Sequence, residues 1–281
     1  MHTAGSPSFF WPPAFLSSHF APAFFFLSAE RRQALKVLYA VFRLLDDAVD
    51  KPGNNPRPLL VAWQNFFESL DASQLRSFGQ EDFASALEAV IKKYDIQQYS
   101  LLDFISCGVM SDLTVKRFET PMDTERYCYG VAGTVGVACL PIFGVPSAEA
   151  KEFAIRLGIT VQWINLIRDV GVDAEMGRIY LPQDHLEKFG CTEADVLARR
   201  ATPEFMNLIR YEAEVARGHY RRAMELLPRK WEKELLPARI MGSIYRKLLA
   251  KIEKHNYPVL SKKITLNLIE KGTATCKAVW S

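Results

Sequence analysis

Cysteine is scarce in this sequence, and the few cysteines stand apart from one another. The 281 residues include five, at positions 107, 128, 139, 191 and 276, and no two of them form a C-x-x-C pair. A zinc site or a disulfide framework needs closely spaced cysteines, so neither is expected. The simplest interpretation is a set of free thiols in a reducing compartment, which predicts a cytoplasmic protein.

Strong net charge and membrane-length apolar runs are also lacking. The formal charge is only +3, and no block of lysine and arginine with interleaved aromatics appears, so nucleic-acid binding is not expected. The apolar stretch from Phe9 to Ser28 has no basic region before it, and His19 and three prolines interrupt it. It is therefore a poor spanning helix. We expect residues 1–16 to be a loosely ordered N-terminal segment, and peripheral membrane contact would suit a lipid substrate.

Signals for short β-strands are missing as well. Glycine and proline, 15 of each, cluster between long stretches with helical periodicity instead of recurring at short intervals. The sequence predicts one all-α domain over residues 1–281, with a loop-like stretch around YLPQDH at 180–185. Helices are expected near 29–50, 59–70, 81–94, 99–113, 123–140, 147–176, 203–227 and 234–255.

The first of these helices carries a polar stripe beside its apolar one. Leucine, phenylalanine and valine recur at helical spacing from Leu35 to Val49 and predict a buried face. One position further on, at spacings of four, three and four, stand Tyr39, Arg43, Asp46 and Asp50. Because a helix turns about 100° per residue, this stripe lies at the margin of the interior and not on the opposite, solvent side.

The long helix near 147–176 repeats the arrangement. Small and polar residues share one face at spacings of four, three, four and four, and Arg168 lies next to them. The flanking turns are strongly apolar, so the carboxylates of this helix are also embedded in an apolar surround. The residues on the polar face are Gly158, Gln162, Asn165, Asp169 and Asp173.

Carboxylates at i, i+4 in an apolar surround repel each other unless a cation compensates. Mg²⁺ favours carboxylate oxygens and keeps phosphate oxygens and waters as its other ligands. Arginines near both pairs suit bidentate recognition of phosphate. A single D-x-x-x-D is usually a solvated or salt-bridged face, and a non-catalytic helical scaffold stays an alternative. Two such pairs favour a site that holds Mg²⁺ ions and diphosphates.

The two helices resemble the two signature regions of squalene/phytoene synthases, the head-to-head prenyl transferases. The first signature is YAVFRLLDDAVD, at 39–50, and the second is QWINLIRDVGVDAEMGRIYLP, at 162–182. SSHF at 17–20 and YCYGVAGTVGVACLPIFG at 127–144 resemble two further segments of that family, in the same order. The resemblance implies an isoprenoid-synthase-type helical bundle around a central cavity. Trp163 departs from the usual aliphatic residue, and an altered pocket wall is expected there.

The resemblance also implies roles for individual residues. The metal ligands, for several Mg²⁺ ions per site, would be Asp46, Asp50, Asp169, Asp173 and Asn165, with Asp47 nearby. Catalysis would involve Tyr39, Arg43 and Tyr180, which match positions that contact the diphosphate or assist its ionisation. Substrate contacts would come from Ser17, Phe20, Phe24, Arg43, Tyr127, Val131, Gly133, Gln162, Asn165, Arg168, Arg178 and Tyr245, with a weaker match at Lys262. Small residues of the 127–144 segment would leave room for the prenyl chains.

The implied activity is Mg²⁺-dependent head-to-head condensation of two prenyl diphosphates. The expected product is presqualene diphosphate made from farnesyl diphosphate, or squalene, for hopanoid or sterol precursors. The alternative is phytoene or dehydrosqualene for carotenoids. The missing G-x-G-x-x-G fingerprint does not exclude NADPH. DDAVD at 46–50 also fits the D-D-x-x-D of head-to-tail synthases and terpene cyclases, but the second signature favours head-to-head coupling.

Overall fold

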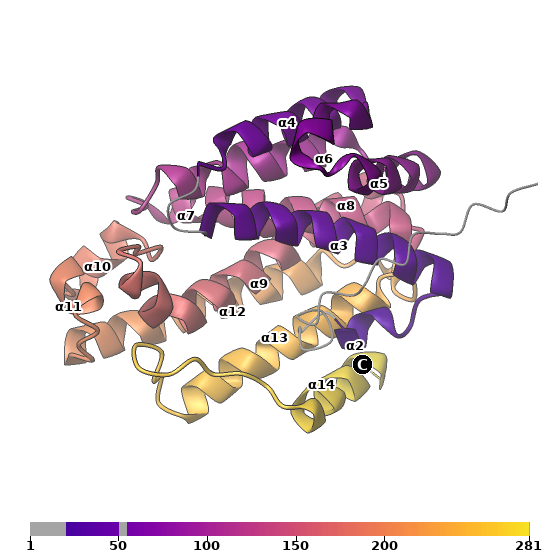
Figure 1. The fold of residues 1–281 in the computed structure, drawn as a ribbon. Helices are drawn as coiled ribbons and strands as arrows, with labels where there is room; N and C mark the ends of the chain where they lie inside the picture. The colour runs from indigo at the N-terminus through magenta and orange to yellow at the C-terminus, as the bar shows by residue number, and fades with distance from the viewer. Residues whose placement is uncertain (1–20, 51–54, 281) are drawn as a thin grey trace, which may run out of the picture.

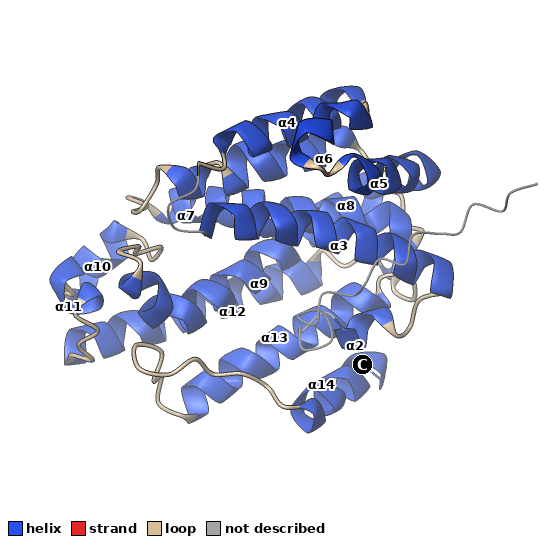
Figure 2. Ribbon diagram, in the orientation of Figure 1, coloured by secondary structure: helices blue, strands red, loops and turns tan. Residues whose placement is uncertain are grey.

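The periodic stretches of the sequence all become helices. The computed structural model describes residues 21–50 and 55–280, and within these ranges the only extended pairing is an isolated bridge between Arg117 and Ile179 (Figure 2). The all-α prediction is therefore confirmed. The segment 1–16, for which loose ordering was expected, lies outside the described residues.

The longest helix, α9 (Ser147–Glu175), runs through the middle of the molecule (Figure 1). It is apolar around most of its circumference, from Ala150 to Ala174, as expected of a buried helix. Three long helices pack against it: α8 (Thr134–Phe143), α12 (Pro203–Glu225) and α13 (Leu236–Lys254). α3 (Ala29–Asp50) packs on α8 and carries the first aspartate stripe.

Further helices cover this centre. α4 (Arg57–Ser69), η1 (Ala72–Phe78), α5 (Glu81–Tyr94) and α6 (Gln98–Asp103) lie together along one side (Figure 1). α10 (Gln183–Phe189) and α11 (Glu193–Leu197) lie at one end, near the start of α12. At the other end, α14 (Leu268–Trp280) packs on α13 and on the short α2 (Ala21–Phe24). η5 (Arg229–Trp231) joins α12 to α13.

A continuous helix from Pro121 to Phe143 consists of α7 (Pro121–Cys128), a π-helical turn η4 (Tyr129–Gly133) and α8. It begins at a capping box in which Thr120 and Asp123 satisfy each other's backbone N–H groups. By length and composition this helix could cross a membrane, whereas the sequence predicted no apolar run of that length. However, 56% of its most apolar window is buried inside the protein, as in an ordinary core helix.

Glycines allow the helices of the centre to cross closely. A Cβ on Gly130 would lie 2.5 Å from the carbonyl carbon of Cys107, in the second π-helical turn, η2 (Phe104–Val109). A Cβ on Gly158 of α9 would lie 2.5 Å from the carbonyl oxygen of Ala132. Gly130 was expected to leave room for prenyl chains, but the backbone of a neighbouring segment occupies the place of its missing side chain. Gly158, expected on the polar face of its helix, meets a neighbouring backbone in the same way.

The predicted boundaries are correct for the long helices and wrong for the irregular ones. The expected helix over 99–113 is α6, the π-helical turn η2 and a 3-10 turn η3 (Ser111–Leu113) in succession. α10 begins inside the stretch YLPQDH, which was expected to be a loop. α11 and α14 were not expected, because α11 is only five residues long and α14 lies beyond the last strong periodic stretch.

Candidate active site

One cavity of about 520 Å³ lies between α3, α8, α9 and α13. Apolar side chains line most of it, and polar side chains gather towards the C-terminal ends of α3 and α9. From Leu35 to Asp46, α3 alone rises roughly 16 Å along the wall. The cavity therefore has an acidic end and an apolar end. The apolar lining includes Phe24, Leu35, Leu38, Phe42, Phe104, Val131, Leu140, Phe143, Leu157, Val161 and Met241.

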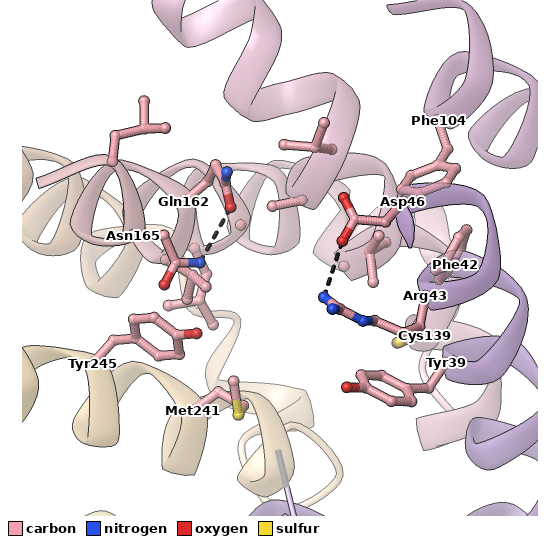
Figure 3. Close-up of a pocket in the computed structure, with 18 of the residues that line it drawn as sticks. Tyr39, Phe42, Arg43, Asp46, Phe104, Cys139, Gln162, Asn165, Met241 and Tyr245 are labelled. Carbon is pink, nitrogen blue, oxygen red and sulfur yellow. Dashed lines mark hydrogen bonds and ion pairs between the residues drawn. The ribbon is translucent and has the colours of Figure 1, made fainter. Parts of the chain in front are cut away.

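The α3 wall presents Tyr39, Arg43 and Asp46 to the cavity (Figure 3). Arg43 Nη1 donates to Asp46 Oδ2 over 3.0 Å, and its Nη2 lies 2.6 Å from Asp47 Oδ1. Asp47 itself does not line the cavity. One guanidinium thus pairs with two adjacent carboxylates, of which only Asp46 lines the cavity.

The α9 wall presents Gln162, Asn165, Asp169 and Asp173, as the helical spacing predicted. Asn165 Nδ2 donates to Gln162 Oε1 over 3.2 Å (Figure 3). Asn165 Oδ1 is buried and has no hydrogen-bond partner among the described residues. A buried acceptor without a partner costs free energy, so this oxygen is available to bind a cation or a hydrogen-bond donor.

Asp169 is held by two cations. Arg168 binds it through two hydrogen bonds, Nε to Oδ1 at 2.8 Å and Nη2 to Oδ2 at 2.5 Å. Lys263 Nζ lies 3.0 Å from Oδ1. Burial acts to raise the pKa of Asp169, but these cations prevail and hold it below the ordinary value. Lys263 was missed from the sequence, which pointed to its neighbour Lys262.

Asp173 differs from Asp169 although it lies one turn further along the same face. Burial, followed by the nearby negative charge of Asp169, raises the pKa of Asp173 to about 7. Arg178, which also lines the cavity, opposes this rise without cancelling it. An added cation would stabilise the ionised carboxylate, so Asp173 is the carboxylate here that gains most from one.

Two tyrosines and an aspartate form a cluster in the wall of the cavity. Tyr180 donates its hydroxyl to Asp112 Oδ1 over 2.7 Å, and Tyr127 donates to Asp112 Oδ2 over 3.3 Å. The two rings stack with centroids 5.1 Å apart at 10°, and Phe118 packs against both. Burial and the Asp112 charge raise the pKa of both phenols, so they stay protonated. Asp112 lines the cavity but was not predicted.

The other predicted substrate contacts divide into three groups. Phe24, Val131, Arg178 and Tyr245 line the cavity. Gly133 does not: a Cβ there would lie 3.1 Å from Tyr129 Cδ2, so it serves the packing of η4. Ser17, Phe20 and the side chain of Asp50 lie outside the described residues, and their roles stay predictions.

Trp163 does not reshape the cavity wall as expected. It is 1% exposed, is not among the lining residues, and points to α12, where its Nε1 donates to Glu212 Oε2 over 3.0 Å. The other oxygen of Glu212 lies 2.7 Å from His185 Nδ1. The prediction was wrong because Trp163 follows Gln162 by about 100° of helix turn, which directs it to the neighbouring helix.

The residues at the acidic end fit Mg²⁺. Among the described residues no three His, Cys, Asp or Glu side chains converge on one point. Mg²⁺ does not require such a cage, since it is usually bound through one or two carboxylates with phosphate oxygens and waters completing the octahedron. Asp46, Asp169 and Asp173 offer hard oxygens from two walls, and the buried Asn165 Oδ1 offers another.

Comparison with known proteins agrees with this geometry. The chain is 32% identical over 260 residues to phytoene synthase 3 of Zea mays, and this match covers 90% of the chain and 60% of that relative. It is 32% identical to phytoene synthase of Arthrospira platensis, over 83% of this chain and 79% of the relative. A crystal structure of a dehydrosqualene synthase superposes with a TM-score of 0.82 at 25% identity, covering 95% and 92% of the two chains.

The chain spans only about three-fifths of the length of the plant relative. The family model for squalene/phytoene synthase matches residues 16–270, which include both aspartate helices and all the cavity-lining residues named above. This chain belongs to the squalene/phytoene synthase family.

Proposed function

We propose that this protein is a Mg²⁺-dependent prenyltransferase that joins two prenyl diphosphates head to head. The observation that carries the proposal is the division of one cavity into an acidic end and an apolar end. Aspartates from α3 and α9 stand at the first, and aliphatic and aromatic side chains line the second. A diphosphate on a long hydrocarbon chain has the same division of polarity.

The diphosphate groups would lie at the acidic end. Arg43, Arg168 and Arg178 all line it, and arginine recognises phosphate oxygens bidentately. Mg²⁺, when bound by Asp46, Asp169, Asp173 and Asn165, would neutralise the charge that develops on a leaving diphosphate. Arg168 binds both oxygens of Asp169. Binding of Mg²⁺ would therefore require Arg168 and the metal ion to share that carboxylate.

The apolar end would protect the cation left when a diphosphate departs. Attack on its C1 by the double bond of the second prenyl chain forms the new carbon–carbon bond, and loss of a proton closes a cyclopropane. Side chains such as Phe42, Phe104 and Tyr39 exclude water, which would otherwise capture the cation. Their aromatic faces also stabilise positive charge.

The phenols at Asp112 have a different role from that of a pre-ionised base. Because burial and the neighbouring carboxylate keep Tyr127 and Tyr180 protonated, each is fixed as a hydrogen-bond donor. Since both hydroxyl hydrogens are donated to Asp112, we assign the stacked rings to lining the substrate site at the acidic end. The departing diphosphate is the stronger proton acceptor beside them.

More than one product is a candidate for this reaction. The sequence favoured presqualene diphosphate, with phytoene or dehydrosqualene as the alternative. The curated relatives found are phytoene synthases, which supports the alternative, and we propose phytoene from two molecules of geranylgeranyl diphosphate. Dehydrosqualene from farnesyl diphosphate is the second candidate, because a dehydrosqualene synthase shares the fold over 95% of this chain.

The test is product identification. Purified protein is incubated with geranylgeranyl or farnesyl diphosphate and Mg²⁺, with and without NADPH, and the lipids are identified by mass spectrometry. Phytoene from geranylgeranyl diphosphate without NADPH supports the proposal. Presqualene diphosphate or squalene from farnesyl diphosphate would return the assignment to the first expectation. Consumption of neither substrate would overturn the enzymatic function and favour a helical scaffold.

A further inference from the structure

The outer face of α14 is apolar and uncovered. Leu268 is 82% exposed, Ile269 78% and Trp280 86%, and the exposed Cys276 lies between them. At about 100° per residue these four side chains fall within an arc of roughly 120°. The opposite face, with Ala274 and Ala278, is buried. α14 therefore has two apolar faces. One is buried against the protein, and the outer one has no partner among the described residues.

Further exposed apolar side chains directly follow α2, the helix against which α14 packs. α14 packs on α2 and on α13, to which it is tied by a 2.8 Å hydrogen bond from Ser243 Oγ to the Ala274 carbonyl. Directly after α2, Phe25 is 78% exposed and Phe26 is also exposed. In Figure 1 α2 and α14 lie side by side at the edge of the molecule. We name Phe25, Phe26, Leu268, Ile269, Cys276, Val279 and Trp280 the α2/α14 face.

The α2/α14 face adjoins the apolar end of the cavity. Phe24, the last residue of α2, lines the cavity and is 5% exposed, whereas the next side chain along is on the outside. Pro237 and Met241, from the first turns of α13, line the same end. A single turn of helix thus separates the interior that would take a hydrocarbon chain from an exposed apolar surface.

The surroundings of the α2/α14 face are basic. Residues 262–280 contain four lysines and one acidic residue, Glu270, which Lys251 holds at 2.7 Å. Of these lysines Lys262 and Lys277 are exposed, whereas Lys271 is buried and Lys263 binds Asp169. Lys277 is exposed at the edge of the α14 face, and Arg32 lies 5.8 Å from the centre of the Phe25 ring. A short helix with an apolar face, lysines at its border and a terminal tryptophan is suited to lie in the surface of a bilayer that contains anionic lipids.

We infer that the α2/α14 face docks on the surface of a lipid bilayer, with the apolar side chains among the acyl chains and the lysines at the headgroups. The exposures and the charges carry this inference, and only its benefit for substrate entry rests on the proposed function. A second protein chain is the alternative occupant, and the experiment below distinguishes it from a bilayer.

The experiment is co-sedimentation of the full chain with vesicles of phosphatidylcholine, alone or mixed with phosphatidylglycerol. The wild-type protein is expected to bind the mixed vesicles more tightly. Replacing both Leu268 and Ile269 by serine is expected to weaken binding at least about tenfold, because several buried methylene groups are lost. Trp280→Ser should weaken it as well. Lys277→Gln should cost about fivefold on mixed vesicles only.

Met122→Ser is the matched control, since Met122 is also 78% exposed but lies on α7, away from the α2/α14 face. It should bind as the wild type does. The inference is overturned if wild-type protein fails to bind either vesicle, or if Met122→Ser weakens binding as much as the double variant does. It is also overturned if the double variant changes only the oligomeric state, which would identify a second copy as the occupant. Prenyltransfer in detergent micelles, measured separately, shows whether a failure concerns this face or the proposed activity.

Discussion

Tyr180 and Asp112 are 68 residues apart in the chain and meet through a 2.7 Å hydrogen bond at the wall of the cavity. Asp112 also accepts a hydrogen bond from Tyr127, so one carboxylate fixes two phenols that stack on each other. The carboxylate follows the π-helical turn η2, and Tyr127 precedes the π-helical turn η4. Such turns re-aim the residues beside them and are frequent at functional sites.

Replacing Asp112 by asparagine is expected to lower the turnover number about 10- to 100-fold, because asparagine keeps one acceptor oxygen and its NH2 group cannot accept the hydrogen bond of the second phenol. Steady-state kinetics with a prenyl diphosphate measures this. Asp103→Asn is the control: Asp103 accepts a 2.6 Å hydrogen bond from Tyr129, but neither residue lines the cavity. A drop in Asp103→Asn equal to that in Asp112→Asn would show that loss of any Tyr–Asp bond is responsible.

Asp173 makes the metal-free protein less stable in alkaline solution. Its pKa is raised from 3.8 to about 7 by burial first and by Asp169 second, so the folded state holds this proton more tightly than the unfolded state does. The contribution of this group to stability therefore falls as the pH rises from about 4 to above 7. Asp173→Asn is expected to unfold about 1–3 kcal/mol less easily than the wild type at about pH 8.

At about pH 5 the advantage of the same variant should shrink, since ionisation of Asp173 then stabilises the unfolded wild-type chain less than it does at about pH 8. Urea unfolding in EDTA at the two pH values measures the difference. Equal stability of the two proteins at about pH 8 would mean that Asp173 is not buried against a like charge.

Mg²⁺ binding should show the opposite trend with pH. A cation must displace the proton from Asp173, so its affinity is expected to rise about tenfold between about pH 6 and pH 8 as a carboxyl group of pKa about 7 ionises. Isothermal titration calorimetry of the protein with MgCl₂ measures it. In Asp173→Asn the pH dependence over this range should disappear, and an unchanged slope would assign the titration to another group.

Gly158 is expected to tolerate no side chain. A Cβ there would lie 2.5 Å from the carbonyl oxygen of Ala132, so Gly158→Ala should destabilise the protein by about 2–3 kcal/mol and separate α9 from η4. Gly272→Ala is the control, since nothing lies within 4 Å of that Cβ in the exposed part of α14. That replacement should stabilise the helix by up to about 1 kcal/mol. Thermal unfolding measures both, and a neutral Gly158→Ala would contradict the close crossing.

Much of the site could be predicted because it lies on two long, regular helices. On α9, spacings of four and three place Gln162, Asn165, Asp169 and Asp173 on one face, and all four line the cavity. Helix α3 gave Tyr39, Arg43 and Asp46 in the same way. Here the period of the helix fixes which side chains share a direction, and the apolar neighbours fix which direction is inward.

The site residues that the sequence did not identify lie outside long helices, where helical periodicity does not predict the direction of a side chain. Asp112 is in a three-residue 3-10 turn, and its partners are 15 and 68 positions away. Lys263 is in a stretch without helix after α13, so nothing in the spacing distinguished it from Lys262. Trp163 was expected to alter the cavity wall because it replaces an aliphatic residue of the family, whereas its buried partner Glu212 is 49 positions away. Only tertiary structure relates such residues.

The central claim is that carboxylates from two separate helices hold the same substrate end. It is tested most directly by the rate of Mg²⁺-dependent diphosphate release from a prenyl diphosphate, in wild type, Asp46→Asn, Asp169→Asn and Asp47→Asn. Release should stop in EDTA and return with Mg²⁺, and it should fall at least about 100-fold in Asp46→Asn and Asp169→Asn. In Asp47→Asn, which alters the adjacent carboxylate outside the cavity lining, it should stay within about fivefold. Release that persists in EDTA, or that survives in either of the first two variants, would contradict the claim.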